Sequence, residues 1–151
     1  MNPGPNTAAP FFTWPVRVYY EDTDAGGVVY HANYIRFMER ARTEFLRHLG
    51  FELTVLEREQ RLIFAVRGLS VDYRRPARLN DWLEVSVDLE AVRSASLLFG
   101  QEVRRDGELL CDARVRVASL TADTFRPMAL PDFMLDRLDG ARPGEVARGC
   151  E

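Results

Sequence analysis

The sequence contains no lysine: its twenty basic residues are all arginine, they stand against 23 acidic residues, and the formal net charge is −3. This balance gives no general case for a nucleic-acid partner. Only two cysteines occur, Cys111 within an alternating apolar pattern and Cys150 next to the end of the chain. Neither a disulfide framework nor a zinc-binding Cys/His cluster is therefore indicated, and we expect no metal.

Long apolar runs are also missing, so no integral membrane segment is expected. The first ten residues lack the basic stretch and apolar core of a secretory signal. The glycine patterns that bind nucleotide phosphates and the G-x-S-x-G pattern of serine hydrolases are absent as well. These absences predict a cytoplasmic protein in a reducing environment.

The length of 151 residues suggests one domain. Residues 1–11 are rich in proline, asparagine and alanine, and we expect a disordered N-terminal tail there. Residues 12–139 carry the periodic apolar patterns of a folded domain. Residues 140–151 are expected to form a flexible C-terminal tail.

An amphipathic helix over residues 33–49 is the clearest element, with Asn33 as its expected N-cap and Gly50 as its stop. Shorter helices are predicted at 53–59 and 131–138. The apolar stripe of the long helix repeats at helical spacing. It consists of Tyr34, Phe37, Met38, Ala41, Phe45 and Leu49.

Alternating patterns predict a short strand at 16–20 and four longer strands in the second half of the chain. Asp106-Gly107 is a strong hairpin signal between the last two. One antiparallel sheet with the long helix lying across it buries the apolar stripe most simply. The expected class is α+β, with a five-stranded sheet. The longer strands are predicted at 62–73, where the apolar pattern breaks near the middle of the segment, and at 83–91, 97–103 and 111–117.

The segment Glu21–Tyr34 concentrates polar residues between the first strand and the long helix. Asp22 and Asp24 are two residues apart, and like charges this close resist ionising together, which favours acid–base or nucleophilic chemistry. The alternative is an Asx-turn, in which an aspartate near glycine only binds backbone N–H groups. The start of a helix also offers unpaired N–H groups to a developing negative charge.

Gly26 and Gly27 permit backbone conformations and a close approach that a side chain would block. His31, at or just before the helix start, could orient a carbonyl or carry a proton, or could simply be a polar helix-end residue. The residues alone leave these two interpretations open.

Other polar residues have simpler interpretations. His48 suits the C-terminal dipole of the helix, and Glu39 suits a solvated or interface position on its polar side. Arg74, Arg75 and Arg78 cluster at a strand end, where a solvated role competes with binding of a nucleotide phosphate.

Two segments carry a resemblance to a known family. Val16–Tyr34, continued by Phe37–Glu44, closely resembles the Tol-Pal-associated, YbgC-type acyl-CoA thioesterases. More broadly the chain is similar to the 4-hydroxybenzoyl-CoA thioesterase group of hotdog-fold enzymes. The similarity extends more loosely through Asp72–Leu79 and covers about residues 14–135.

The resemblance implies a hotdog fold and a homodimer whose sheets join edge to edge, often paired into a homotetramer. It places the catalytic aspartate at Asp24 and the histidine of this subgroup at His31, whose backbone N–H polarises the substrate carbonyl. No cofactor is implied. The residues expected to support the site are Tyr20, Asp22, Gly26, Gly27 and Tyr30.

The implied activity is hydrolysis of acyl-CoA thioesters to free acid and thiol, with acyl carrier protein as a further candidate partner. Asp24 would attack the carbonyl carbon or deprotonate water, and the sequence leaves both routes open. The main alternative is a non-catalytic acyl-carrier or envelope-assembly binding module on the same fold, and a hydratase is a third. The acyl chain length is not readable from the sequence.

Overall fold

The computed structural model describes residues 12–141. The predicted N-terminal tail therefore lies outside the described residues, as does all of the predicted C-terminal tail except Gly140 and Ala141. The helices and strands follow one another in this order: β1 (Phe12–Arg17), the short 3₁₀ helix η1 (Tyr20–Asp22), α1 (His31–His48), α2 (Leu53–Gln60), β2 (Leu62–Tyr73), β3 (Trp82–Val92), β4 (Ser96–Arg105), β5 (Glu108–Thr121) and α3 (Asp132–Gly140).

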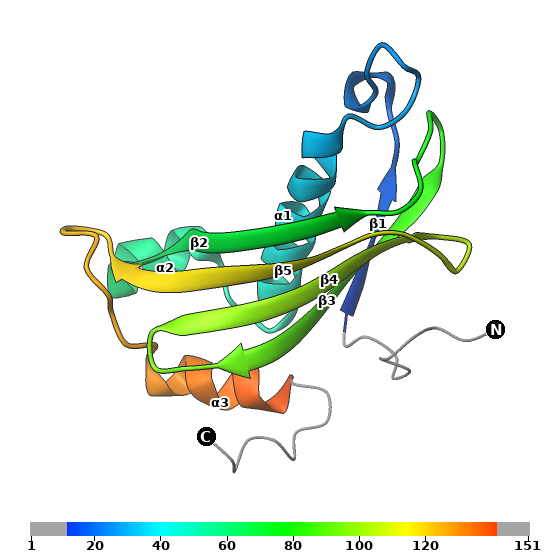
Figure 1. The fold of residues 1–151 in the computed structure, drawn as a ribbon. Helices are drawn as coiled ribbons and strands as arrows, with labels where there is room; N and C mark the ends of the chain where they lie inside the picture. Colours follow the sequence, from blue (N-terminus) through cyan, green and yellow to red (C-terminus); the bar gives the residue numbers. More distant parts are fainter. Residues whose placement is uncertain (1–11, 142–151) are drawn as a thin grey trace.

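The strands form one five-stranded antiparallel sheet in the order β1-β3-β4-β5-β2. The long strands pass across α1, which lies against one face of the sheet (Figure 1). The predicted α+β class and antiparallel sheet are confirmed. Because β1 and β2 are the two edges, β2 presents one side with no neighbouring strand among the described residues.

Helix α1 supplies much of the core because its apolar residues recur at helical spacing and face the sheet. Phe45 meets Phe99 of β4 edge-on, with ring centroids 6.0 Å apart. Burying side chains of this size stabilises the fold by about 1.5–3 kcal/mol each. The buried residues of the helix are Tyr34, Phe37, Met38, Ala41, Phe45 and Leu46.

The end of α1 and the tightest hairpin follow the sequence signals. Gly50 adopts φ +95°, and the N–H of Phe51 donates to the carbonyl of Leu46, which closes the helix as predicted. Asp106 and Gly107 adopt φ values of 50° and 83° in the turn between β4 and β5. The run predicted at 62–73 is one strand with a register shift between Val66 and Gly68.

The strand predicted at 16–20 is wrong in its extent. β1 ends at Arg17 because its pairing with β3 ends there, opposite Trp82. The following Val18 instead exchanges backbone hydrogen bonds with Asn80 and Asp81 in a loop. The apolar alternation in the sequence continues beyond the residues that pair with β3. The chain does not continue as a strand there but enters η1.

The expected N-cap is also wrong. Helix α1 begins at His31, two residues before the predicted start, and Tyr30 occupies the N-cap position without a side-chain capping bond. Asn33 lies in the first turn, where its side chain donates to Asp22 instead of capping the helix.

No helix of the described residues 12–141 is long and apolar enough to cross a membrane.

Candidate active site

The loop before α1 is a small closed turn rather than an open connection. Thr23 pairs with Val29, and the N–H of Asp24 donates to the carbonyl of Val28. The N–H of Gly27 donates back to the carbonyl of Asp24, and Gly27 adopts φ +83°, which disfavours residues with a side chain. Asp24 therefore sits at the base of a tight four-residue turn.

Asp22 is the structural member of the carboxylate pair. Its side chain is 5% exposed, and its two oxygens accept hydrogen bonds from different elements. Oδ2 accepts from the Tyr19 N–H and Oδ1 from the Asn33 side chain, both at 2.8 Å. The Asp22 carbonyl also accepts the N–H of Tyr30 at 2.9 Å. Asp22 thus ties the chain entering the loop to the first turn of α1.

Asp24 is exposed, and only one of its carboxylate oxygens is engaged. Oδ1 accepts the N–H of Gly26 at 2.8 Å, which is the Asx-turn that the sequence left as the alternative. A Cβ on Gly26 would lie 3.2 Å from this oxygen, so glycine is what allows the close approach. Oδ2 makes no hydrogen bond within residues 12–141 and stays available for a water molecule or a substrate.

The N-terminus of α1 presents donors beside this carboxylate. Across the described part of the chain, the backbone N–H groups of His31 and Ala32 have no hydrogen-bond acceptor. The hydroxyl of Tyr73 donates to the His31 carbonyl at 2.8 Å, and its ring stands edge-on to the His31 ring at 6.3 Å. The Tyr30 ring also contacts the His31 ring, with centroids 4.6 Å apart. The first helical residue thus contacts two tyrosine rings.

An open hollow of about 320 Å³ brings these groups together. Among the predicted site residues, Asp24, His31, Arg74 and Arg75 line it. Sequence reasoning did not assign Tyr73 to the site, although it lies in the Asp72–Leu79 segment that carries part of the family resemblance. The complete lining is Asp24, Val28, Val29, His31, Tyr34, Tyr73, Arg74, Arg75 and Pro76.

The other predicted residues lie around the hollow rather than in its wall. Tyr20 is 81% exposed on η1. Arg78 is exposed, and its backbone N–H donates to Asp81. Asp22, Gly26, Gly27 and Tyr30 shape the loop and the helix start through the contacts described above.

The two arginines in the wall are already paired with carboxylates. Arg74 Nε lies 2.6 Å from Asp112 Oδ1, and Arg75 Nε lies 3.0 Å from Glu108 Oε2. All four side chains are partly exposed, so these ion pairs contribute little to stability.

Two ionisable groups near the hollow, Cys111 and Tyr34, are poor candidates for the reacting group. Burial raises the pKa of Cys111 to about 12, so its thiol stays protonated and is a poor nucleophile. Burial likewise raises the pKa of Tyr34, whose hydroxyl accepts the N–H of Ala77 at 2.9 Å. Within residues 12–141, no group of His, Cys, Asp or Glu side chains could hold a metal ion.

Comparison with known proteins identifies the family. Residues 18–138 match the thioesterase-like superfamily. The acyl-CoA thioesterase YbgC of Haemophilus influenzae is 49% identical over 120 residues, covering 80% of this chain and 88% of that protein. The acyl-CoA thioester hydrolase YbgC of Escherichia coli O6:H1 is 51% identical over 121 residues, covering 80% and 90%. A probable thioesterase from Bartonella henselae superposes with a TM-score of 0.77 at 34% identity, covering 80% and 98%. The chain therefore belongs to the thioesterase-like superfamily of hotdog-fold thioester hydrolases, in the group that contains the YbgC proteins.

Proposed function

We propose that this protein hydrolyses acyl-CoA thioesters, with Asp24 supplying the reacting carboxylate. The observation that carries the proposal is that Asp24, with one carboxylate oxygen unengaged, lines the same hollow as His31 at the N-terminus of α1. The thioester carbonyl oxygen binds the N–H groups of His31 and Ala32, which stabilise the negative charge that develops on it. Asp24 then either attacks the carbonyl carbon, expelling the thiolate and forming an anhydride that water hydrolyses, or takes a proton from a water that attacks directly. The CoA thiolate is a good leaving group, so no strong acid is needed.

The decisive experiment measures thiol release from a panel of acyl-CoA thioesters by the wild type and by Asp24→Asn. The asparagine keeps an oxygen that accepts the Gly26 N–H, so the turn is preserved while the carboxylate is lost. We expect activity to fall by about 10²–10⁴-fold. Asp106→Asn is the matched control, because it makes the same change in the exposed β4–β5 turn.

Two results would contradict the proposal: a wild type that releases no thiol from any thioester, or an Asp24→Asn variant as active as the control. Binding of acyl carrier protein that is indifferent to Asp24→Asn, without any turnover, would favour the non-catalytic module instead.

We assign the nucleotide part of CoA to Arg74 and Arg75, because they line the hollow and their present ion pairs are solvent-exposed. Arg75→Gln should raise the KM for an acyl-CoA and leave the KM unchanged for the matching acyl-pantetheine, which lacks the nucleotide phosphates. Equal effects on both substrates would remove Arg75 from this role.

The active assembly is a dimer joined through β2. This strand is a sheet edge, and three large side chains along it stay exposed: Val66 at 52%, Leu69 at 42% and Tyr73 at 47%. A long apolar edge favours pairing with another strand. Antiparallel pairing of two β2 strands would cover it and continue the sheet into a second copy.

Leu69→Lys tests this pairing, since a lysine on an edge strand opposes association. Light scattering should show a smaller species than the wild type, with the circular dichroism spectrum retained. Leu79→Lys is the control, because it makes the same change at an exposed leucine outside β2. An unchanged mass for Leu69→Lys would refute the β2 interface.

A further inference from the structure

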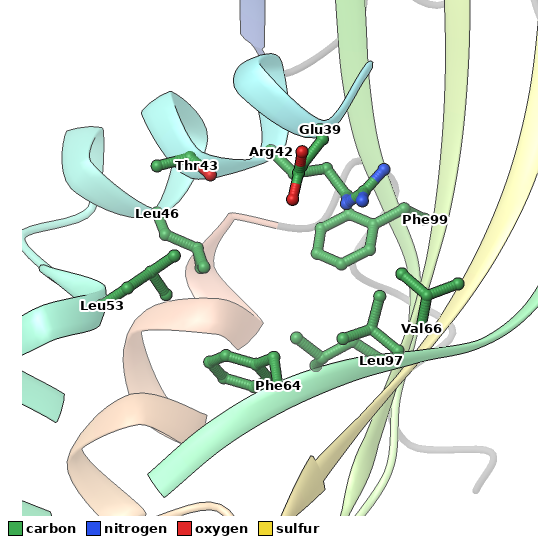
Figure 2. A pocket seen from close by; sticks show the side chains of 10 residues that line it. Glu39, Arg42, Thr43, Leu46, Leu53, Phe64, Val66, Leu97 and Phe99 are labelled. Atoms are coloured by element: carbon green, nitrogen blue, oxygen red, sulfur yellow. The ribbon is translucent and has the colours of Figure 1, made fainter. Parts of the chain in front are cut away.

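A second cavity, of about 110 Å³, lies between α1, α2 and the sheet, apart from the hollow that holds Asp24 (Figure 2). Its walls from α2 and the strands are apolar, whereas α1 contributes the polar residues Glu39, Arg42 and Thr43. A cavity that is apolar except on one side, where an arginine stands among polar residues, is suited to a ligand that is apolar along its length and anionic at one end. The apolar lining is Leu46, Leu53, Phe64, Val66, Leu97, Phe99 and Val117.

Arg42 enters this cavity as a largely desolvated cation with spare donors. In Figure 2 its side chain extends from α1 toward Phe99 and the strands. One guanidinium nitrogen, Nη1, donates to Gln101 Oε1 at 2.9 Å, and within residues 12–141 no carboxylate lies within 4.0 Å of the group. A guanidinium carries five N–H donors, so most of its hydrogen-bonding capacity is unused by the described residues.

The residue behind Arg42 is fixed, so the guanidinium is held in place rather than loosely packed. Gln101 is 1% exposed, and its Nε2 donates to the carbonyls of Met38 and Ser86. These bonds turn Oε1 toward Arg42. The position of the cation is therefore set by the core, as a preorganised binding group requires.

Glu39 does not neutralise this cation. It lies one turn away on the same helix and is exposed, so water screens its charge. Burial lowers the pKa of Arg42, and the attraction of Glu39 opposes this only in part. A partly buried cation without a paired anion is unfavourable, and an incoming carboxylate reduces that cost.

The volume limits the length of the occupant. An apolar cavity of about 150 Å³ accommodates benzene, with six carbon atoms. By the same ratio, about 110 Å³ holds a group of about four carbon atoms.

The cavity and the reacting carboxylate come together across the proposed dimer rather than within one copy. His31 and Arg42 are separated by about 16 Å of helix, which a four-carbon acyl chain does not span. Tyr73, beside His31, ends β2, whereas Phe64 and Val66 of its first half line the cavity. Antiparallel pairing about the middle of β2 therefore brings the Asp24 hollow of one copy to the cavity of the other.

We propose that this cavity receives a short acyl group, of about four carbon atoms, whose far end carries a carboxylate, and that Arg42 binds that carboxylate. The inference rests on the proposed function and deepens it, because it names the class of thioester: half-thioesters of short dicarboxylic acids.

Succinyl-CoA and butyryl-CoA test it, since both acyl groups have four carbons and only one ends in a carboxylate. Rates are corrected for release without protein. The wild type should have the higher kcat/KM for succinyl-CoA, and Arg42→Gln should lower the succinyl-to-butyryl ratio by about 10- to 100-fold. Arg40→Gln, on the exposed side of the same helix, should leave the ratio unchanged.

Arg42→Lys keeps the positive charge and should retain most of the preference even if Arg42→Gln folds poorly, which melting curves would reveal. A wild type that prefers butyryl-CoA, or a ratio that neither Arg42 variant changes, would overturn the inference while leaving thioester hydrolysis intact. Failure to hydrolyse either these or any longer acyl-CoA would instead overturn the proposed function, and the inference with it.

Discussion

The structural role of Asp22 and the proposed catalytic role of Asp24 can be separated by replacing each aspartate with asparagine. Asp22 accepts two charge-assisted hydrogen bonds while almost fully buried, and each such bond contributes about 1.5–3 kcal/mol. Asp22→Ala would remove both and leave the Tyr19 N–H without an acceptor. Its expected cost is about 3–6 kcal/mol, a large share of the stability of a typical domain.

Asp22→Asn is the more informative variant because it keeps the shape of the side chain. Its amide oxygen can still accept the Tyr19 N–H, and its NH₂ can bond to Asn33 once that amide turns over. Two neutral hydrogen bonds then replace two charge-assisted ones, which should lower the free energy of unfolding by about 1–3 kcal/mol. At about 2–4 °C per kcal/mol for a chain of this size, the melting temperature should fall by about 2–12 °C.

The assay pairs thermal unfolding, followed by circular dichroism, with thiol release per folded molecule. Asp22→Asn should lose stability and keep most of its activity, whereas Asp24→Asn should keep its melting temperature and lose its activity. The reverse pattern, a stable but inactive Asp22→Asn, would move the chemistry to Asp22 and refute the assignment.

Three smaller predictions concern the surroundings of this loop. Tyr73→Phe removes the hydroxyl that binds the His31 carbonyl but keeps the ring, so kcat should fall more than KM rises in steady-state kinetics; an unchanged kcat would deny Tyr73 a positioning role. Gly26→Ala places a methyl group 3.2 Å from Asp24 Oδ1 and should lower kcat at nearly unchanged stability, and wild-type kinetics would show that the turn adapts freely. Because burial raises the pKa of Cys111 to about 12, an alkylating reagent at pH 8 should modify it only after unfolding, as peptide mapping by mass spectrometry would show.

The sequence predicted most reliably those features that short segments determine by themselves. The stop at Gly50 depends on one backbone conformation and was predicted correctly. The stripe on α1 depends on spacing and was correct except at its end, where Leu46 is buried and the predicted Leu49 is the C-cap. The strand at 16–20 was misplaced because the end of β1 depends on where β3 begins, and local alternation does not report that distant partner.

In the candidate site, too, the features that depend on distant partners were not predicted. Asp24 and His31 lie on one continuous segment, so a motif could mark them together. Asn33 was misassigned because its side chain bonds to Asp22, eleven residues earlier, rather than to its own helix. Tyr73 reaches His31 only through the path of β2, at a separation of 42 residues. Nothing in the local sequence distinguishes Tyr73 from other tyrosines at strand ends, so its contact with His31 could not be predicted.

Tyr73 also connects the geometry of the site to the proposed dimer. It is half exposed at the end of an edge strand, and an unpaired edge of this kind is among the less stable parts of a fold. The residue that holds the first turn of α1 therefore stands on an element that pairing with a second copy would immobilise. It follows that the proposed dimer should do more than supply the proposed acyl cavity, because it would also fix the helix end that we propose binds the thioester carbonyl. Association and catalytic geometry are then coupled, and specific activity should fall on dilution in parallel with dissociation of the dimer.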